Sequence, residues 1–115
     1  MARLSREQVL NAKDIKEKEI KVPEWGGEVL VKTLSAKERS KMMAEIFDLR
    51  TGAPKNPETY YQIAIFYGCV DPKFEKADIE ALGEKSGVAL ERVGQAILRM
   101  AGLDPSTIDE ISKNL

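Results

Sequence analysis

The 115-residue chain contains no histidine and only one cysteine, Cys69. The absence of histidine removes both the commonest general base and the commonest metal ligand of proteins. A lone cysteine excludes an internal disulfide and is typical of a protein from a reducing cytoplasm. We therefore expect no catalytic residues, no metal site and no cofactor in this chain.

Long apolar runs and targeting signals are also lacking. The longest apolar run, residues 63–70, is far shorter than the roughly 20 residues that a membrane-spanning helix needs. The first six residues do not open into the apolar segment of a signal peptide. The sequence thus predicts a soluble, intracellular protein.

Neither sign of charge dominates, since 18 basic side chains stand against 19 acidic ones and leave a net charge of −1. The chain therefore lacks the broad positive field with which nucleic-acid-binding and membrane-surface proteins attract their partners. Hydrophobic residues make up 43% and charged residues 32%, a balance typical of globular domains. This length suits one domain, and we predict a single domain over 1–115.

The N-terminal residues contain the start signal of a short helix. Ser5 and Gln8 have the spacing of a capping box, which predicts a helix through about Ala12. Its only apolar anchors would be Leu4, Val9 and Ala12. The apolar face of this helix is therefore narrow.

Alternation of apolar and charged residues predicts two strands, over 14–22 and 28–34, that form a β-hairpin. Lysines on the first strand are typical of an edge strand. Pro23 ends that strand, and the glycines at 26 and 27 supply the positive φ of a tight reversal. The apolar strand positions are Ile20 and Val22 in the first strand, Val29 and Val31 on one face of the second, and Leu30 and Leu34 on its other face.

The residues from 35 onward have helical periodicity. Ser35 and Glu38 form a second capping box, which predicts a helix to about Arg50. Its buried face would contain, at helical spacing, Met42, Met43, Ile46, Phe47 and Leu49.

Further helices are predicted from their start and stop signals. Asn-Pro-Glu at 56–58 begins a helix that is apolar on nearly all sides, which we expect at the centre of the molecule. Two more are predicted over 77–84 and 88–101, with Gly102 as the stop of the second. A last helix from Asp104 has a narrow apolar stripe, so we expect it to be only partly docked.

These elements predict an α+β fold that is mainly α. A short N-terminal helix and a two-stranded β-hairpin, together residues 1–34, would pack on a bundle of about four to five helices. The helical core would span 35–103, and residues 104–115 would form a mobile terminal helix.

Cys69 and the acidic residues are the remaining candidates for chemistry. Cys69 follows the most apolar helix and has no histidine partner, so we interpret it as a buried core thiol. The acidic residues are interspersed with lysines at helical spacing, as on ordinary solvated surface. An enzyme with a carboxylate site among them is the weakest of our three hypotheses.

Residues 82–93 resemble the helix-turn-helix of DNA-binding repressors, with a glycine-containing turn before the second helix. Residues 77–101, however, contain four acidic and three basic side chains, whereas contact with phosphates needs the opposite balance. We expect a plain helical hairpin here and keep a small helix-turn-helix DNA-binding regulator as the alternative function.

Trp25, the only tryptophan, has two interpretations. It could fold back over the hairpin and cover a small core, which we favour. It could instead be an exposed aromatic anchor for a protein partner, since aromatic residues are common hot spots. The methionines likewise suit either a core or an adaptable binding surface.

Four short segments suggest a family. They are Val-Pro-Glu-Trp-Gly-Gly at 22–27 with Val-Leu-Val at 29–31, Leu-Ser-Ala-Lys-Glu-Arg at 34–39, Ala-Ile-Leu-Arg-Met-Ala-Gly-Leu at 96–103, and the ending Lys-Asn at 113–114. Together they span nearly the whole chain, which resembles the phage tail assembly chaperones of long-tailed phages and related prophages in Gram-positive bacteria. The chain departs from the family at Ala36 and Ala101, where a more polar small residue is expected.

The resemblance implies a non-enzymatic role in phage tail assembly. Such chaperones coat the long helical tape measure protein and keep it soluble until tail tube subunits polymerise around it. The implied partners are the tape measure protein, further copies of the chain in a homo-oligomer and the tail tube protein, with no nucleic acid or membrane. The implied location is the bacterial host cytoplasm, with absence from the mature virion, and a longer frameshifted product often accompanies such chains.

Six residues are our candidates for contact with a protein partner. They are the only tryptophan, Trp25; three residues of the helix predicted from Ser35, namely Met42, Met43 and Phe47; and two residues of the predicted last helix, Ile108 and Ile111.

Overall fold

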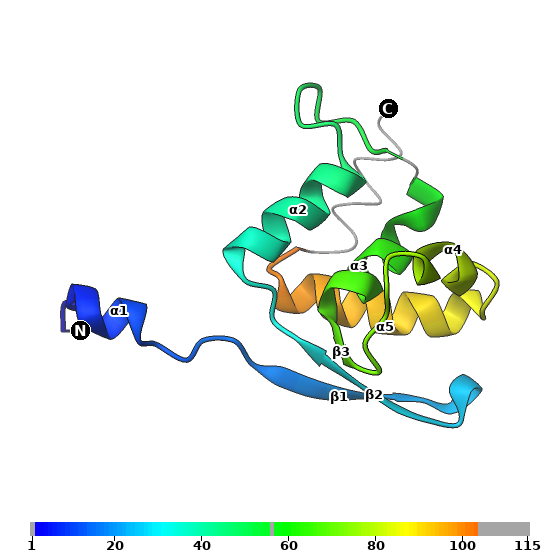
Figure 1. Ribbon diagram of the computed structural model, residues 1–115, viewed down its shortest axis with the longest axis horizontal. Coiled ribbons are helices and arrows are strands. Elements are labelled where there is room, and N and C mark those ends of the chain that lie inside the picture. Colours follow the sequence, from blue (N-terminus) through cyan, green and yellow to red (C-terminus); the bar gives the residue numbers. More distant parts are fainter. Residues whose placement is uncertain (1, 56, 104–115) are drawn as a thin grey trace.

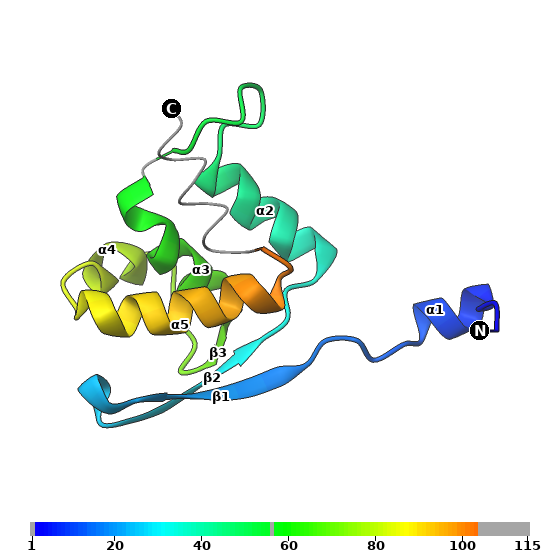
Figure 2. The same cartoon turned by 180° about the vertical axis from the view of Figure 1, so that it is seen from behind.

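The computed structural model describes residues 2–55 and 57–103. It contains a three-stranded antiparallel sheet, helices that cover one face of that sheet, and an N-terminal arm that extends away from both (Figures 1 and 2). The predicted α+β class, mainly α, is confirmed. The terminal helix predicted from Asp104 lies outside the described residues.

The elements follow one another in a simple order along the chain. They are α1 (Arg6–Leu10), β1 (Glu17–Val22), a 3-10 turn η1 (Pro23–Trp25), β2 (Gly27–Lys32), α2 (Ala36–Ile46), a 3-10 turn η2 (Pro57–Thr59), α3 (Tyr60–Gly68), β3 (Cys69–Asp71), α4 (Asp78–Leu82) and α5 (Gly87–Met100).

The predicted hairpin forms, but its strands are shorter than predicted: β1 begins at Glu17 and not at 14, and β2 ends at Lys32 and not at 34. β1 pairs with β2 so that Ile20 lies opposite Val29, and both side chains face the core. Of the two glycines at the reversal, only Gly26 has a positive φ, 75°. A left-handed backbone at this point favours glycine, because a side chain there would be strained.

The sheet has a third strand that the sequence did not predict. After α3 the chain runs straight into β3, whose Cys69 pairs with Val31 of β2. Three residues are too few to show strand periodicity, and they directly follow a helix. The extra strand supports a hairpin that would be marginal alone.

Helix α5 crosses the sheet and α3, and the core lies between these layers. Two glycines allow close helix packing: a Cβ at Gly68 would collide with Ile97, and one at Gly94 would lie 2.7 Å from the Tyr61 ring. The fully enclosed large side chains are Met42, Ile46, Ile65, Ile97, Leu98, Val22, Val31 and Val93.

Two predicted helices differ from the structure. The first ends at Leu10, short of Ala12, and buries no residue, because no other element packs on it. The second ends at Ile46 and not at Arg50. From Phe47 the backbone is extended and pairs with Pro54, and the N–H of Asp48 donates to the carbonyl of Ala53 (2.8 Å).

Because α2 ends early, the prediction that Leu49 lies on its buried face is wrong. Leu49 is 70% exposed in the loop after the helix, and so it does not belong to the buried face. Both predicted capping boxes are confirmed. The Ser5 and Ser35 side chains each accept from the backbone N–H three residues later, and their own backbone N–H groups donate to the Gln8 and Glu38 side chains. No helix in the described part of the chain is long and apolar enough to cross a membrane.

Candidate functional site

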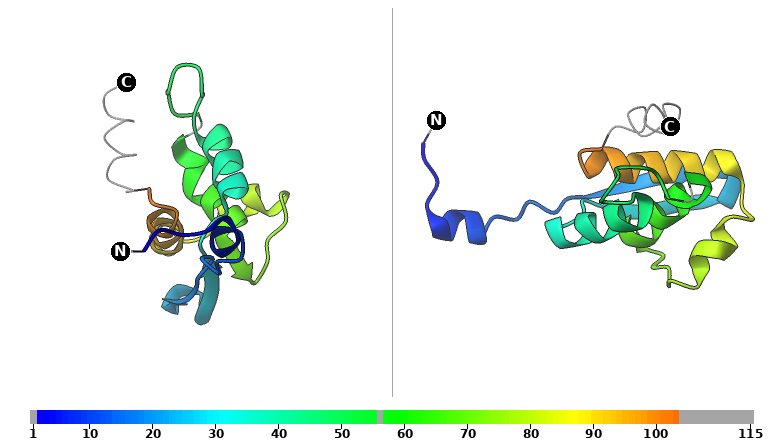
Figure 3. Two further views of the ribbon diagram at one scale, coloured as in Figure 1. Left: turned by 90° about the vertical axis from the view of Figure 1, so that its left-hand side faces the viewer. Right: turned by 90° about the horizontal axis from the view of Figure 1, so that it is seen from above.

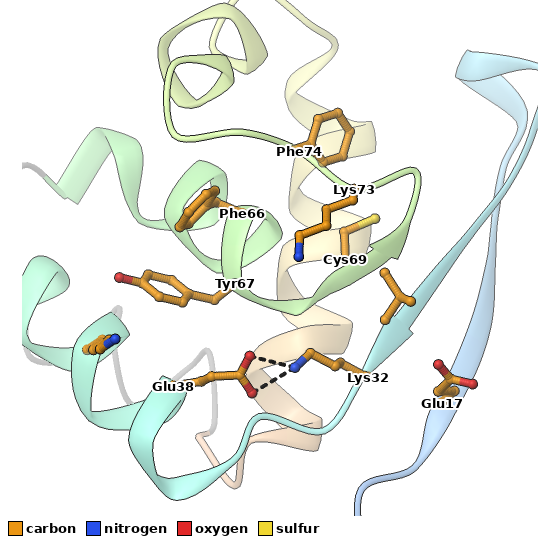
Figure 4. A pocket seen from close by; sticks show the side chains of 10 residues that line it. Glu17, Lys32, Glu38, Phe66, Tyr67, Cys69, Lys73 and Phe74 are labelled. Atoms are coloured by element: carbon orange, nitrogen blue, oxygen red, sulfur yellow. Dashed lines mark hydrogen bonds and ion pairs between the residues drawn. The ribbon is translucent and has the colours of Figure 1, made fainter.

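An open groove runs between β3, the segment that follows it, α3 and α2 (Figure 4). One part, of about 470 Å³, borders the sheet, and a second part, of about 510 Å³, continues along α2. The two parts share Lys41, Phe66 and Tyr67. They therefore form one continuous surface depression, which we call the α2–α3 groove.

Aromatic residues form the apolar part of the groove. Phe66 and Tyr67, at the end of α3, make an edge-to-face contact with ring centroids 4.9 Å apart. Both are partly exposed, because the preceding residues of α3 take the positions that face the core. Phe74 lies at the outer end of the groove. A groove with exposed aromatic rings has unsatisfied apolar surface that a partner can bury.

An ion pair forms the wall between β2 and α2. The Lys32 Nζ donates to both carboxylate oxygens of Glu38, at 2.6 and 2.7 Å, and Glu38 also accepts from the Ser35 backbone N–H. Burial on its own would raise the Glu38 pKa, but these hydrogen bonds outweigh it and the pKa is lowered. The pair is therefore ionised at neutral pH and closed to other partners.

Two other lysines of the groove have no such partner. Within the described residues, the ammonium groups of Lys41 and Lys73 make no hydrogen bond or ion pair, whereas Lys76 lies 3.5 Å from a carboxylate oxygen of Glu45. Figure 4 shows Lys73 reaching from the segment after β3 toward the hollow. The groove thus combines aromatic surface with two positive charges that remain available to an anionic partner group.

Tyr67 contributes a phenol hydroxyl to the groove. Burial, followed by the nearby Glu45 carboxylate, raises the pKa of Tyr67 to about 12. Tyr67 is consequently neutral at all physiological pH values and can act only as a hydrogen-bonding phenol.

Cys69 also borders the groove but is a poor nucleophile. It is 5% exposed, and burial raises its pKa to about 11. Only about one thiol in ten thousand would then be ionised at pH 7, and the thiolate is the reactive form. The prediction of a buried core thiol is confirmed.

The predicted contact residues do not form one site. Met42 has no exposed surface and Phe47 is 7% exposed, so both belong to the core cluster. Phe47 also lines a small hollow at the end of α2. Adjacent helical residues point about 100° apart, which explains why Met43 stays partly exposed while Met42 is enclosed. Ile108 and Ile111 lie outside the described residues.

Trp25 belongs to the turn at the tip of the hairpin. It is partly exposed and packs against the core cluster, as expected for a tryptophan that covers the core. It lies on η1, whereas the groove lies along α2 and α3. The groove residues were not among the predicted contact residues. Their only signal in the sequence is the pair of adjacent aromatics, Phe66 and Tyr67, at the end of a helix that is apolar on nearly all sides.

The predicted helical hairpin at 82–93 is present as α4, a turn and α5. Arg92, near the start of α5, forms a two-point ion pair with Glu24 of the β-hairpin turn, at 2.5 and 3.0 Å. The hydrogen bond from Arg92 lowers the Glu24 pKa to about 2, so the pair is ionised at neutral pH. This arginine is therefore already occupied within the chain.

The described residues include no group of three or more cysteine and acidic side chains placed to hold a metal ion. No protein-family model, curated protein or solved structure matches the chain.

Proposed function

We propose that this chain is a non-enzymatic phage tail assembly chaperone that binds the tape measure protein and keeps it soluble during tail morphogenesis. The family resemblance of the sequence suggests the role, and the α2–α3 groove is the observation that carries it. The chaperone would act in the bacterial host cytoplasm, associate with further copies of itself and leave before the virion matures. Contact with the tail tube protein is part of the same proposal.

The chemistry of the groove suits a helical client. Amphipathic helices bind their partners by laying an apolar face into a hydrophobic groove. Phe66, Tyr67 and Phe74 supply that apolar surface, and Lys41 and Lys73 favour acidic residues beside the client's apolar stripe. The bound client segment would therefore be an amphipathic helix flanked by glutamate or aspartate.

Co-expression tests this function. When the tape measure protein encoded by the same genome is produced with this chain, we expect a severalfold larger share of it in the soluble fraction than when it is produced alone. The chain should also co-purify with it. An unchanged soluble fraction, at an equal level of total tape measure protein, would contradict the proposal.

A further inference from the structure

Most exposed large apolar side chains of the described residues lie on the N-terminal arm, which we define as residues 2–16. Four of the six are there, and the other two, Leu49 and Val88, belong to the body of the molecule. The four arm residues and their exposed fractions are Leu4 69%, Val9 56%, Leu10 66% and Ile15 46%. Concentration on one short segment distinguishes this arm from ordinary scattered surface residues.

Helix α1 of the arm has a complete capping box although it is only five residues long. Ser5 and Gln8 cap one another's backbone N–H groups at 2.8 and 3.1 Å. Leu4 precedes the cap and Val9 is the fourth helical residue, which is the spacing of a hydrophobic staple. A five-residue helix is nevertheless marginal in water unless its apolar side packs on something.

The arm packs on no other element within residues 2–55 and 57–103. Its attachment is the end of the β1–β2 pairing, where the N–H of Thr33 donates to the carbonyl of Lys16 (2.8 Å). Beyond this point it projects away from the sheet and the helices, and the views in Figures 1 and 3 agree on this. The described part of the same copy therefore leaves the apolar side chains of the arm uncovered.

Charge favours a second copy of this chain as that molecule. Residues 1–16 contain four basic and two acidic side chains, a net charge of +2, while residues 17–115 have a net charge of −3. Arm and body thus attract one another between copies. The α2–α3 groove is lined by four lysines and three glutamates, so it attracts the basic arm less than the acidic body as a whole does.

The body offers one apolar hollow beside an exposed leucine. Met43, Phe47, Leu49 and Gly52, with Asp48 as the only charged lining residue, surround about 230 Å³ at the end of α2. Leu49 is 70% exposed there. Val88 lies instead at the exposed start of α5 and borders none of the hollows described above.

We propose that the N-terminal arm of one copy docks α1 into the Leu49 hollow of another copy, so that the chain self-assembles by arm exchange. Leu4, Val9 and Leu10 would enter the hollow. Reciprocal exchange gives a closed dimer, whereas exchange in one direction gives a ring or a filament. The proposal is independent of the client, because it needs only this chain.

Sedimentation velocity of the full chain tests it, without any tape measure protein. We expect concentration-dependent association in the micromolar range. The variant V9D/L10D should raise the dissociation constant about tenfold or more, since a charged residue in an apolar contact removes a hot spot. L49D should do the same, and V88D, the matched exposed apolar residue, should leave association unchanged.

A mixture of V9D/L10D and L49D sharpens the test. Each variant keeps the half of the contact that the other lacks, so the mixture should regain association through one intact arm and hollow. All substituted positions are exposed, and unchanged melting temperatures would show that the fold is kept. A monomeric full chain at 100 µM or above, association of V9D/L10D equal to the native chain, or disruption by V88D and not by L49D would each overturn the proposal.

Discussion

Replacing Gly68 with alanine is expected to lower the free energy of unfolding by about 1–3 kcal/mol, the usual cost of inserting a methyl group into a packed core. A Cβ at this position would lie 2.8 and 2.9 Å from the Cγ1 and Cδ1 atoms of Ile97 and closer still to its Cγ2. Ile97 has no exposed surface and cannot move away freely. Alanine would therefore push α3 away from α5.

Urea unfolding followed by circular dichroism measures this effect. Gly87→Ala is the matched control, because Gly87 also lies on a helix but a Cβ there meets nothing within 4 Å. The control should be neutral or slightly stabilising. Combining Gly68→Ala with Ile97→Val should cost less than the sum of the two single changes, and strict additivity would show that the two residues are not in contact.

Reversing the two available charges of the α2–α3 groove is expected to weaken binding of the tape measure protein about tenfold or more, by removing two attractive contacts and adding repulsion. The variant is K41E/K73E. Both lysines lie at the surface of the groove without a partner in the described chain, so the substitutions leave the core and the Lys32–Glu38 pair in place.

The control for this variant is K37E/K85E. Both of these lysines are exposed and lie outside the groove, and the change in net charge is the same. Isothermal titration calorimetry with the purified client at low salt should show near-native affinity for the control. Equal losses in the two variants would mean that only overall charge matters, which contradicts a groove-specific contact.

The parts of the fold that depend on neighbouring residues could be predicted from sequence. The serine caps at Ser5 and Ser35, the reversal at Gly26 and the alternation of Ile20 and Val22 all act over a few residues, and the structure confirms each of them. Gly102, with a φ of 80°, likewise follows the end of α5 as predicted.

The parts of the fold that depend on pairing between residues far apart in the sequence could not be predicted. β3 is defined by its hydrogen bonds to β2, which lies far from it in sequence. The end of α2 at Ile46 depends on backbone pairing with the chain that returns after the loop, where the N–H of Lys55 donates to the carbonyl of Ile46 (2.6 Å). Helical periodicity alone continued past this point and wrongly assigned Leu49 to the core.

The groove was hidden from sequence for the same reason. Lys41 belongs to α2, Phe66 to α3, and Lys73 to the segment after the unpredicted third strand. No local pattern joins them, since only the tertiary fold brings them to one surface. The methionine and tryptophan signals instead pointed to Met42, which lies in the core, and Trp25, which packs against it.

Hydrogen–deuterium exchange with and without saturating tape measure protein tests the central claim most directly, because it locates the client on the chain. The account predicts slower exchange in peptides from 38–45 and 66–76, which border the α2–α3 groove, and little change at the hairpin tip, residues 22–27, and in α5. Slower exchange confined to the hairpin or α5, or no change anywhere at saturation, would contradict it.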